Sequence, residues 1–175
     1  MTKEDFEQEL KPLAKFHTIE EFWGLYKHMI RPSQLETCTK LFLFQSNIKP
    51  LWEDEANKNG GRFYLRIKKE GADKLWENLV LAYISDNFEF NDDICGLQMA
   101  VRHDNIVVIS LWVQSMKTSV KEETTRWLRD KLYVPNKIRI EYQDHPRSHE
   151  KKNYHGSSAP WERNNNYRGG NRNKY

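Results

Sequence analysis

The sequence predicts an α+β fold, in which about three helices pack on the convex face of a curved antiparallel sheet. The first observation is that short β-rich runs alternate with three segments whose apolar residues recur at helical spacing. The second is that residues 62–68 and 137–141 alternate polar with apolar side chains, as strands with one solvated face do. Helices would cover the apolar face of such a sheet, and the other face would remain for a ligand.

Three helices are expected from apolar periodicity and from signals at their ends. The first spans about 19–29, behind Thr18, which has a glutamate three residues later and so begins a capping box. The second holds 74–84, where a wide apolar arc repeats every three and four residues. The third begins at a second capping box, at Ser119, and ends before Pro135.

Five strands are expected to make up the sheet. They cover residues 41–44, 62–68, 97–102, 107–112 and 137–142. The third and fourth are close enough in sequence to form a hairpin. The helices and strands together assign residues 1–142 to one folded domain, which suits a 175-residue chain with 38% hydrophobic residues.

Residues 143–175 form a basic tail that we expect to be disordered. Apolar residues are sparse there, and seven basic residues against three acidic ones give the tail a net charge of +4. Its scattered aromatic rings and arginines would allow weak, salt-sensitive contact with RNA. A solubilising tail without a ligand is an equally good interpretation.

Composition argues against several classes of protein. No stretch approaches the roughly 20 apolar residues that span a bilayer, and the acidic start lacks the apolar segment of a signal peptide, so we expect a cytoplasmic or nuclear protein that is not in a membrane. Cys38 and Cys95 have no histidine or second cysteine at ligand spacing, which favours buried free thiols over a metal site or a disulfide. No nucleophile has a placed base, so we expect a binding module that needs no cofactor, and not an enzyme.

Trp52 and Glu53 form the most informative pair in the chain. They lie side by side in the run IKPLWEDEANKNGG, residues 48–61, where Asp54 and Glu55 are interpreted as solvated turn acids. An indole face attracts delocalised positive charge, and a carboxylate accepts two parallel N–H bonds from one edge of a purine. N7-methylguanine, the base of the mRNA cap, offers both features. The alternative is a half-buried tryptophan at a strand end, beside an acidic turn.

That run resembles the cap-binding segment of the eukaryotic translation initiation factor 4E family. The stretches FHTIEEFWGLYKHM before it and ICGLQMAVR after it are similar to that family's next landmarks in the same order, so the resemblance covers roughly 6–142. ANKNGG and WENLVLAY look more like the type 2 branch, the 4E homologous protein, than the founding factor. The resemblance implies a cupped-hand fold that binds capped mRNA through its 7-methylguanosine triphosphate.

By this resemblance, five residues make up the cap site. Phe6 would stack on the base opposite Trp52, and Glu53 would accept bonds from the guanine N1–H and N2–H. Arg102 would bind phosphate, and Trp112 would touch the N7-methyl group. Phenylalanine has a smaller, less electron-rich face than tryptophan, so we expect weaker cap affinity than in a site with two tryptophans. Each residue also has a plainer interpretation, as an apolar residue near a terminus, a surface strand end or a core ring.

One departure from the family bears on the phosphates. The founding factor has a lysine on the strand after its phosphate-binding arginine, where this chain has Ile106 and Val107. Phosphate affinity should therefore fall, unless His103, Arg147 or other cations of the tail compensate.

A second set of residues matches the family's face for protein partners. Ile19 and Trp23 lie one turn apart on the first helix and match the residues that dock a partner helix carrying Y-x-x-x-x-L-Φ, as in 4E-binding proteins or the initiation scaffold. Trp76 and Leu81 on the second helix carry the same resemblance. Glu77 stands where the founding factor has leucine, so partner preference should differ. The alternative is that the two tryptophans are core residues.

These features predict an mRNA cap-binding protein in translational control, and a type 2 translational repressor within that class. Only five residues precede Phe6, where the family carries a long strand rich in tryptophan, so we expect a sheet that lacks this first strand and exposes an edge. A partner-binding scaffold, or a truncated isoform with impaired cap binding, is the alternative. A single-stranded RNA binder that acts through the tail is a third hypothesis.

Overall fold

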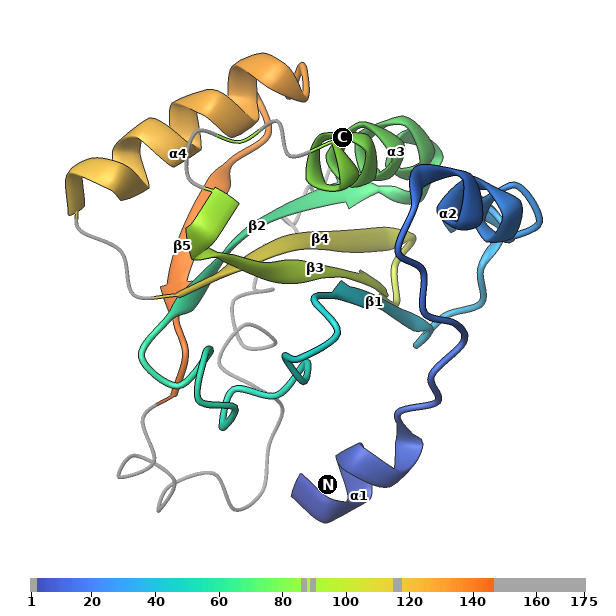
Figure 1. Ribbon diagram of the computed structural model, residues 1–175. Coiled ribbons are helices and arrows are strands. Elements are labelled where there is room, and N and C mark those ends of the chain that lie inside the picture. Colours follow the sequence, from blue (N-terminus) through green and yellow to red (C-terminus); the bar gives the residue numbers. More distant parts are fainter. Residues whose placement is uncertain (1–2, 86–87, 89–90, 115–117, 147–175) are drawn as a thin grey trace, which may run out of the picture. The chain divides into compact units, whose positions relative to one another are not determined.

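A five-stranded antiparallel sheet forms the frame of the molecule (Figure 1). Its strand order is β1-β3-β4-β2-β5. The strands are β1 (Lys40–Phe44), β2 (Gly61–Lys68), β3 (Ile94–Val101), β4 (Ile106–Val113) and β5 (Ile140–Asp144). The predicted sheet is confirmed, with strand ends that differ from the expected ones by up to three residues.

The computed structural model describes residues 3–85, 88, 91–114 and 118–146. The described residues up to His145 belong to one compact unit, Met1–His145. β5 continues to Asp144, so the sheet extends two residues beyond the predicted end of the folded domain. The rest of the predicted tail, from residue 147 onward, lies outside the described residues.

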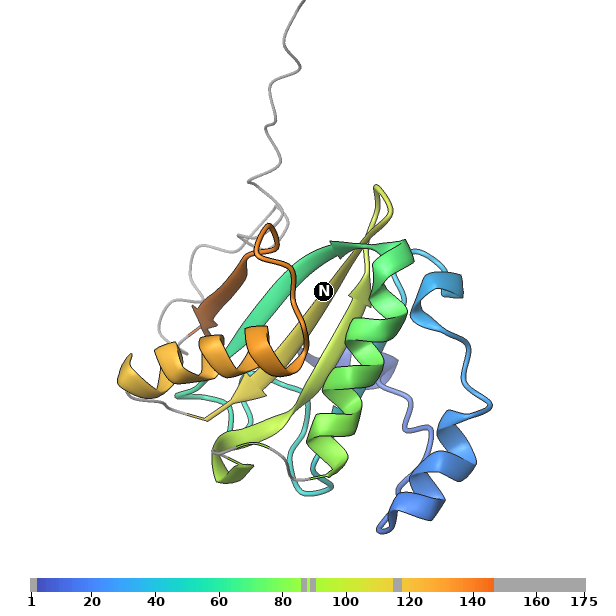
Figure 2. The same cartoon turned by 90° about the horizontal axis from the view of Figure 1, so that it is seen from above.

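Three helices cover one face of the sheet, as predicted (Figures 1 and 2). They are α2 (Ile19–Tyr26), α3 (Ala72–Ile84) and α4 (Thr118–Lys131), and single 3-10 turns occupy Pro32–Gln34, Lys69–Gly71 and Asn91–Asp93. A fourth helix, α1 (Lys3–Glu9), lies below the sheet in Figure 1 and was not predicted. Its sequence, KEDFEQE, has one apolar residue, so helical periodicity gives no signal there.

The start of α2 has the predicted capping box in a shifted form. Thr18 Oγ1 accepts a hydrogen bond from Glu21 N at 3.2 Å, and the Glu21 carboxylate accepts one from His17 N at 2.7 Å. In the usual box the glutamate bonds the backbone of the cap residue itself. The helix ends at Tyr26, earlier than predicted, because the backbone N–H groups of His28 and Met29 bond to carbonyls three positions back and tighten the last turn.

The core lies between the helices and the odd-numbered residues of the central strands. These strand residues are Phe63, Leu65, Ile67, Leu97, Met99, Val101, Val107, Ile109, Leu111 and Val113. Because successive side chains of a strand point to opposite faces, the even-numbered residues of the same strands point away from the helices. We call that second side the lower face, after its orientation in Figure 1.

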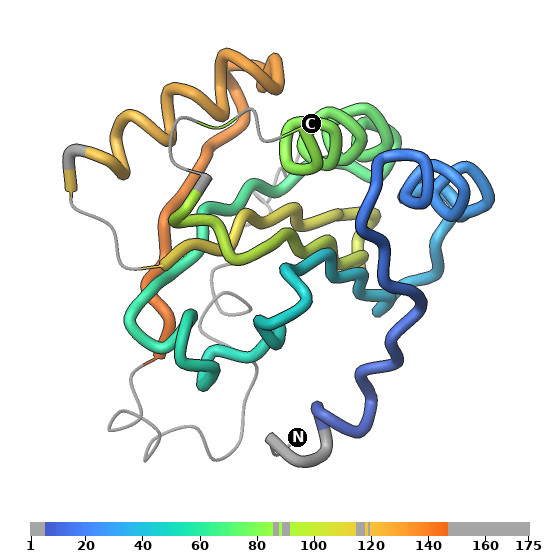
Figure 3. Tube along the Cα trace, viewed as in Figure 1, coloured from blue at the N-terminus to red at the C-terminus, as the bar shows by residue number. Residues whose placement is uncertain are grey.

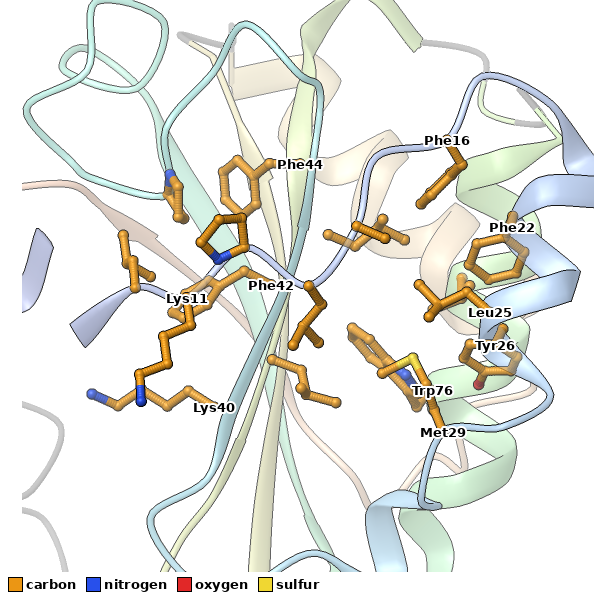
Figure 4. Close-up of a pocket in the computed structure, with 18 of the residues that line it drawn as sticks. Lys11, Phe16, Phe22, Leu25, Tyr26, Met29, Lys40, Phe42, Phe44 and Trp76 are labelled. Atoms are coloured by element: carbon orange, nitrogen blue, oxygen red, sulfur yellow. The ribbon is translucent and has the colours of Figure 1, made fainter. Parts of the chain in front are cut away.

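β1 lies at one edge of the sheet. It pairs with β3 on one side, and the segment that joins α1 to α2 runs past its other side (Figure 3). A cavity of about 570 Å³ lies between that segment, β1, α2 and α3. Phe42 and Phe44 stand on one wall, and Phe22 and Trp76 on the other (Figure 4).

No helix within the described residues is long and apolar enough to cross a membrane.

Candidate functional site

The β1–β2 loop, residues 45–60, is held in shape by polar side chains that bond its own backbone. The Asp54 carboxylate accepts hydrogen bonds from Lys49 N at 3.0 Å and from Ala56 N at 3.1 Å. Asp54 is half-buried, and beyond the solvated turn acid that was expected it is a structural part of the turn. Glu55 is solvated as expected, since its side chain is 86% exposed and pairs only with Lys58 among the ion pairs of the described chain.

Asn57 fixes the same loop from the inside. It is fully buried, and its side-chain nitrogen donates to Lys49 O at 2.9 Å and to Leu51 O at 2.8 Å. Two carbonyls of the turn before it thus have a partner inside the protein. Nothing in the sequence marks an asparagine in a polar run as buried, so this residue was not among the predicted ones.

Two glycines let the loop return against the sheet. A Cβ atom at Gly60 would lie 2.0 Å from the Val113 carbonyl oxygen, and one at Gly61 would lie 2.4 Å from the Tyr142 hydroxyl. Gly60 O also accepts a bond from His145 N at 2.9 Å. Only glycine allows such close approach of the loop to β4 and β5.

Trp52 projects from this fixed loop. It is 43% exposed, whereas Ile48 and Leu51 in the same loop are 8% and 6% exposed. Glu53 follows it directly and is half-buried. A partly exposed indole on a rigid turn offers a flat apolar face for stacking, with a carboxylate as its neighbour.

Trp112 lies on the lower face and is 7% exposed. Its Nε1 donates to Gln98 Oε1 at 3.0 Å, and its ring stands edge-on to Phe44 with centroids 5.4 Å apart. With Ile48 and Cys95 it forms a small second core between the sheet and the β1–β2 loop. The structure therefore links the predicted methyl-contacting tryptophan to the loop that bears the exposed one.

Phe6 is carried by α1 and lies against β1. Its ring is edge-on to Phe42 with centroids 6.1 Å apart, and Lys40 Nζ is 5.3 Å from its centroid. Glu7, the next residue of α1, pairs with Lys49 of the β1–β2 loop at 3.5 Å. α1 is thus attached to the loop that bears the exposed tryptophan, and the stacking of one base between the two rings stays a prediction.

β2 places a group of polar side chains on the lower face that was not among the predicted site residues. The guanidinium carbons of Arg62 and Arg66 lie 5.4 Å and 4.8 Å from the centroid of the Tyr64 ring between them. Tyr64 Oη and Arg66 Nη1 both donate to the Glu141 carboxylate at 3.1 Å, and Arg62 donates to Gln143 at 3.0 Å. The alternation of residues 62–68 was the available signal, because it puts these three side chains on one face.

Arg102 follows β3 and adds a third guanidinium to this region. Its backbone N donates to Ile106 O at 2.7 Å across the hairpin, and its side chain is half-buried. Burial, together with the charges of Arg102 and Arg66, lowers the pKa of Arg62 to about 10, against an opposing effect of Tyr64. The charges are therefore close enough to repel one another, which makes the lower face a favourable place for an anion.

His145 closes the end of this face beside Trp112. It is 7% exposed, and its ring centroid lies 4.3 Å from that of Trp112. Burial and the charge of Arg62 lower the pKa of His145 to about 4, although Asp144 acts in the other direction. His145 is therefore neutral at physiological pH and does not add to the positive charge.

The predicted partner face is open at two of its residues. Ile19 on α2 is 52% exposed and Leu81 on α3 is 36% exposed. Trp23 is half-buried and stands edge-on to Tyr26, with centroids 5.6 Å apart. Ile19 and Leu81 thus present exposed aliphatic side chains on two helices, and Trp23 is partly exposed. Together they give a partner helix an apolar surface to pack on.

Two other residues of that predicted face are engaged within the protein. Trp76 is 4% exposed and belongs to the core, where a docking helix would not reach most of its ring. The Glu77 carboxylate pairs with Arg31 at 3.7 Å, which links α3 to the turn after α2.

The two cysteines are free thiols, as predicted, but only Cys95 is buried. Cys38 is exposed, because it lies in a turn before β1, with its sulfur 3.8 Å from His103 Nε2. Within the described residues, no three His, Cys, Asp or Glu side chains are grouped to hold a metal ion.

A sequence model of the family Eukaryotic initiation factor 4E matches residues 1–160. The chain belongs to this family. The eukaryotic translation initiation factor NCBP of Triticum aestivum is 36% identical over 146 residues, which are 83% of this chain and 62% of the wheat protein. The chain thus spans less than two thirds of that relative's length.

Solved structures of the 4E family confirm the fold. Ascaris suum eIF4E-3, crystallised with an m2,2,7G cap, matches with a TM-score of 0.76 at 36% identity, over 82% of this chain and 83% of the other. C. elegans eIF4E-3, in complex with the 4E-binding protein Mextli, matches with a TM-score of 0.74 at 31% identity, over 79% and 82%. The 4E family is one of binding proteins rather than enzymes.

We expect Asn57→Ala to lower the free energy of unfolding by about 1–3 kcal/mol, because the buried Leu51 carbonyl would be left without its partner and the Lys49 carbonyl would lose its bond. Asn59→Ala is the matched control, since Asn59 is exposed in the same loop, and it should change stability by less than about 0.5 kcal/mol. Urea denaturation followed by circular dichroism measures both. Equal effects of the two variants would contradict the role given to Asn57.

We expect the stability of the protein to fall as the pH is lowered from about 6.5 to about 4. In that window the unfolded chain binds a proton at His145 that the folded protein does not, so stability is fully present above 6.5 and is lost by up to roughly 3 kcal/mol near pH 4. Denaturation at several pH values should show a shallower loss for His145→Gln. An NMR titration with an ordinary histidine pKa for His145 would contradict this expectation.

Proposed function

We propose that the protein binds the 7-methylguanosine cap of mRNA and acts in translational control in the cytoplasm. The observation that carries this proposal is the exposed Trp52 indole, set beside Glu53 on a loop whose turns are bonded from within by Asn57. A methylated guanine is flat and positively charged, and its edge carries two N–H donors. The loop offers a complement to each of these properties.

The base would lie on the Trp52 indole. Base–aromatic stacking contributes about 1–3 kcal/mol, and the positive charge of the methylated ring adds a cation–π attraction of roughly 0.5–2 kcal/mol. Phe6 of α1 would form the second wall. Trp112 would approach the N7-methyl group from the sheet, through the 7% of its surface that is exposed.

Guanine would be selected by hydrogen bonds at its edge. The Glu53 carboxylate accepts the N1–H and N2–H donors in parallel, and the backbone N–H of Trp52 donates to O6. Adenine presents an acceptor where guanine has the N1–H donor, so the same carboxylate would be left facing an acceptor. Arg102 would bind the phosphates by charge-assisted bonds.

The family relatives support this ligand. The Ascaris suum structure contains an m2,2,7G cap, in a protein 36% identical to this chain. Within cap binding, we propose the role of a type 2 translational repressor, which occupies the cap without recruiting the initiation scaffold productively. The ANKNGG and WENLVLAY stretches, which resemble the type 2 branch, support that role.

We expect Glu53→Ala to weaken binding of 7-methyl-GTP by at least about 100-fold, because two charge-assisted bonds of roughly 1.5–3 kcal/mol each are lost. Quenching of intrinsic tryptophan fluorescence measures the affinity, with GTP as the unmethylated control. Glu55→Ala is the matched variant, since Glu55 lies two residues away in the same loop and is solvated, and it should bind as the wild type does. Unchanged binding by Glu53→Ala would show that guanine is not recognised there.

We also propose that α2 and α3 bind a partner helix carrying Y-x-x-x-x-L-Φ, as found in 4E-binding proteins and the initiation scaffold. The exposure of Ile19 and Leu81 beside Trp23 favours this second function. C. elegans eIF4E-3, 31% identical to this chain, has been solved in complex with the 4E-binding protein Mextli, which supports it. The two functions use different parts of the fold and are compatible.

We expect Leu81→Glu to weaken binding of a Y-x-x-x-x-L-Φ peptide by about 30-fold or more, as loss of an interface hot spot does. Glutamate keeps the helix, so the effect would come from the charge placed in an apolar contact. Leu13→Glu is the control, since Leu13 is 69% exposed but lies between α1 and α2. Isothermal titration calorimetry would distinguish the variants, and equal losses for both would count against this face.

A further inference from the structure

We propose that Arg66 on β2 is a second phosphate-binding residue of the cap site, which holds the triphosphate chain together with Arg102. This inference rests on the proposed cap-binding function and adds to it the residue that takes the place of the lysine absent after Arg102. The ligand group is a polyphosphate or phosphodiester oxygen, and the contact would be a bidentate, charge-assisted one.

Arg66 on β2 and Arg102 after β3 lie on opposite sides of β4, which is the strand between them. We call the part of the lower face between the two arginines the strip. Arg66 is paired with Val108 on β4, and Val108 is paired with Ala100 on β3. Arg102 lies two residues beyond Ala100, so its side chain emerges on the same face. Strands are about 4.8 Å apart, and β2 and β3 are therefore separated by about 10 Å.

That separation suits a phosphate chain. Ala100 and Val108, on the strands between the two arginines, are short, apolar and buried, so neither side chain competes with a guanidinium for an anion. Arg62 lies near enough to feel both charges, as the lowering of its pKa shows. An arginine on either side of a narrow strip can bind two successive phosphate groups, each with a planar pair of N–H donors.

The charges around Arg66 leave it able to bind an anion. Its contact with Glu141 is an exposed ion pair, with side chains 38% and 45% exposed, and such pairs contribute about 0–1 kcal/mol. Glu141 is shared with the Tyr64 hydroxyl, and Arg62 bonds an amide, Gln143, rather than an acid. The contacts of the two β2 guanidiniums thus involve one carboxylate, that of Glu141.

The Tyr64 ring holds both arginines of β2 in place. Each guanidinium lies within cation–π distance of the ring, at 5.4 Å for Arg62 and 4.8 Å for Arg66. Tyr64 itself is 9% exposed and bonded through its hydroxyl, so its position is fixed. A phosphate would meet a preorganised cation, which lowers the entropy lost on binding.

The test compares 7-methyl-GMP with 7-methyl-GTP for the full chain and for three variants. Arg66→Gln should leave 7-methyl-GMP affinity unchanged and weaken 7-methyl-GTP by about tenfold, the loss of one charge-assisted contact. Arg126→Gln is the matched control, since Arg126 is an exposed arginine on α4, and it should change neither affinity. Glu141→Gln should strengthen 7-methyl-GTP binding, by up to about fivefold, because it releases Arg66 from its carboxylate.

The opposite signs separate a ligand role from a structural one. If Arg66 only stabilised the sheet through Glu141, Arg66→Gln and Glu141→Gln would shift unfolding together and would leave the ratio of the two nucleotide affinities unchanged, which would overturn the proposal. If the wild type bound neither nucleotide, the cap function itself would fail. The affinity of wild type and Arg66→Gln for inorganic tripolyphosphate would then be compared. Equal affinities would overturn the phosphate role as well.

Discussion

The alternation of side chains along β2, β3 and β4 is the constraint on which both the core and the site depend. Phe63, Leu65 and Ile67 of β2 are locked into the core against the helices. A slip of one residue would turn them to the lower face, so the core fixes the register of β2. Because Arg62, Tyr64 and Arg66 alternate with these residues, burial on one face sets the geometry of the cations on the other.

The β1–β2 loop extends this order beyond the sheet. Ile48 and Trp112 meet in the second core, so the loop is attached to the lower face by apolar contact as well as by hydrogen bonds. Asn57 bonds the first turn, and the two glycines let the end of the loop rejoin β2 without a clash. The exposed Trp52 therefore has a defined position relative to Trp112, although Trp52 itself lies in no strand or helix.

Much of this fold could be predicted from the sequence, because its strands and three longer helices show periodic apolar residues. α1 could not, since a seven-residue polar helix gains its position from tertiary contacts such as the ring contact of Phe6 with Phe42. β5 begins at Ile140 rather than at 137, since alternation continues into residues that form a turn before the strand. Local pattern alone does not show where pairing with β2 starts.

The site was predicted less completely than the fold, for a related reason. Trp52 and Glu53 are visible in the sequence because their chemistry is unusual, and Phe6, Arg102 and Trp112 came from the family resemblance. Asn57 was not visible, because a buried amide and a solvated one look alike in a polar run. The cations of β2 were visible only as one half of an alternating strand. Their closeness to Arg102 arises from strand order, which places β4 alone between β2 and β3.

The two walls proposed for the base differ in how firmly the protein holds them. The Trp52 wall is fixed by the hydrogen bonds of the buried Asn57 side chain and by the second core. The Phe6 wall belongs to a helix too short to be stable alone, which is attached by an edge-on ring contact and by an ion pair whose side chains are 70% and 36% exposed. A base that contacted both rings would favour the docked position of α1 by its differential affinity for that position. The fixed wall would then give the site its selectivity for guanine. The equilibrium between docked and undocked α1 would set the affinity for a capped RNA.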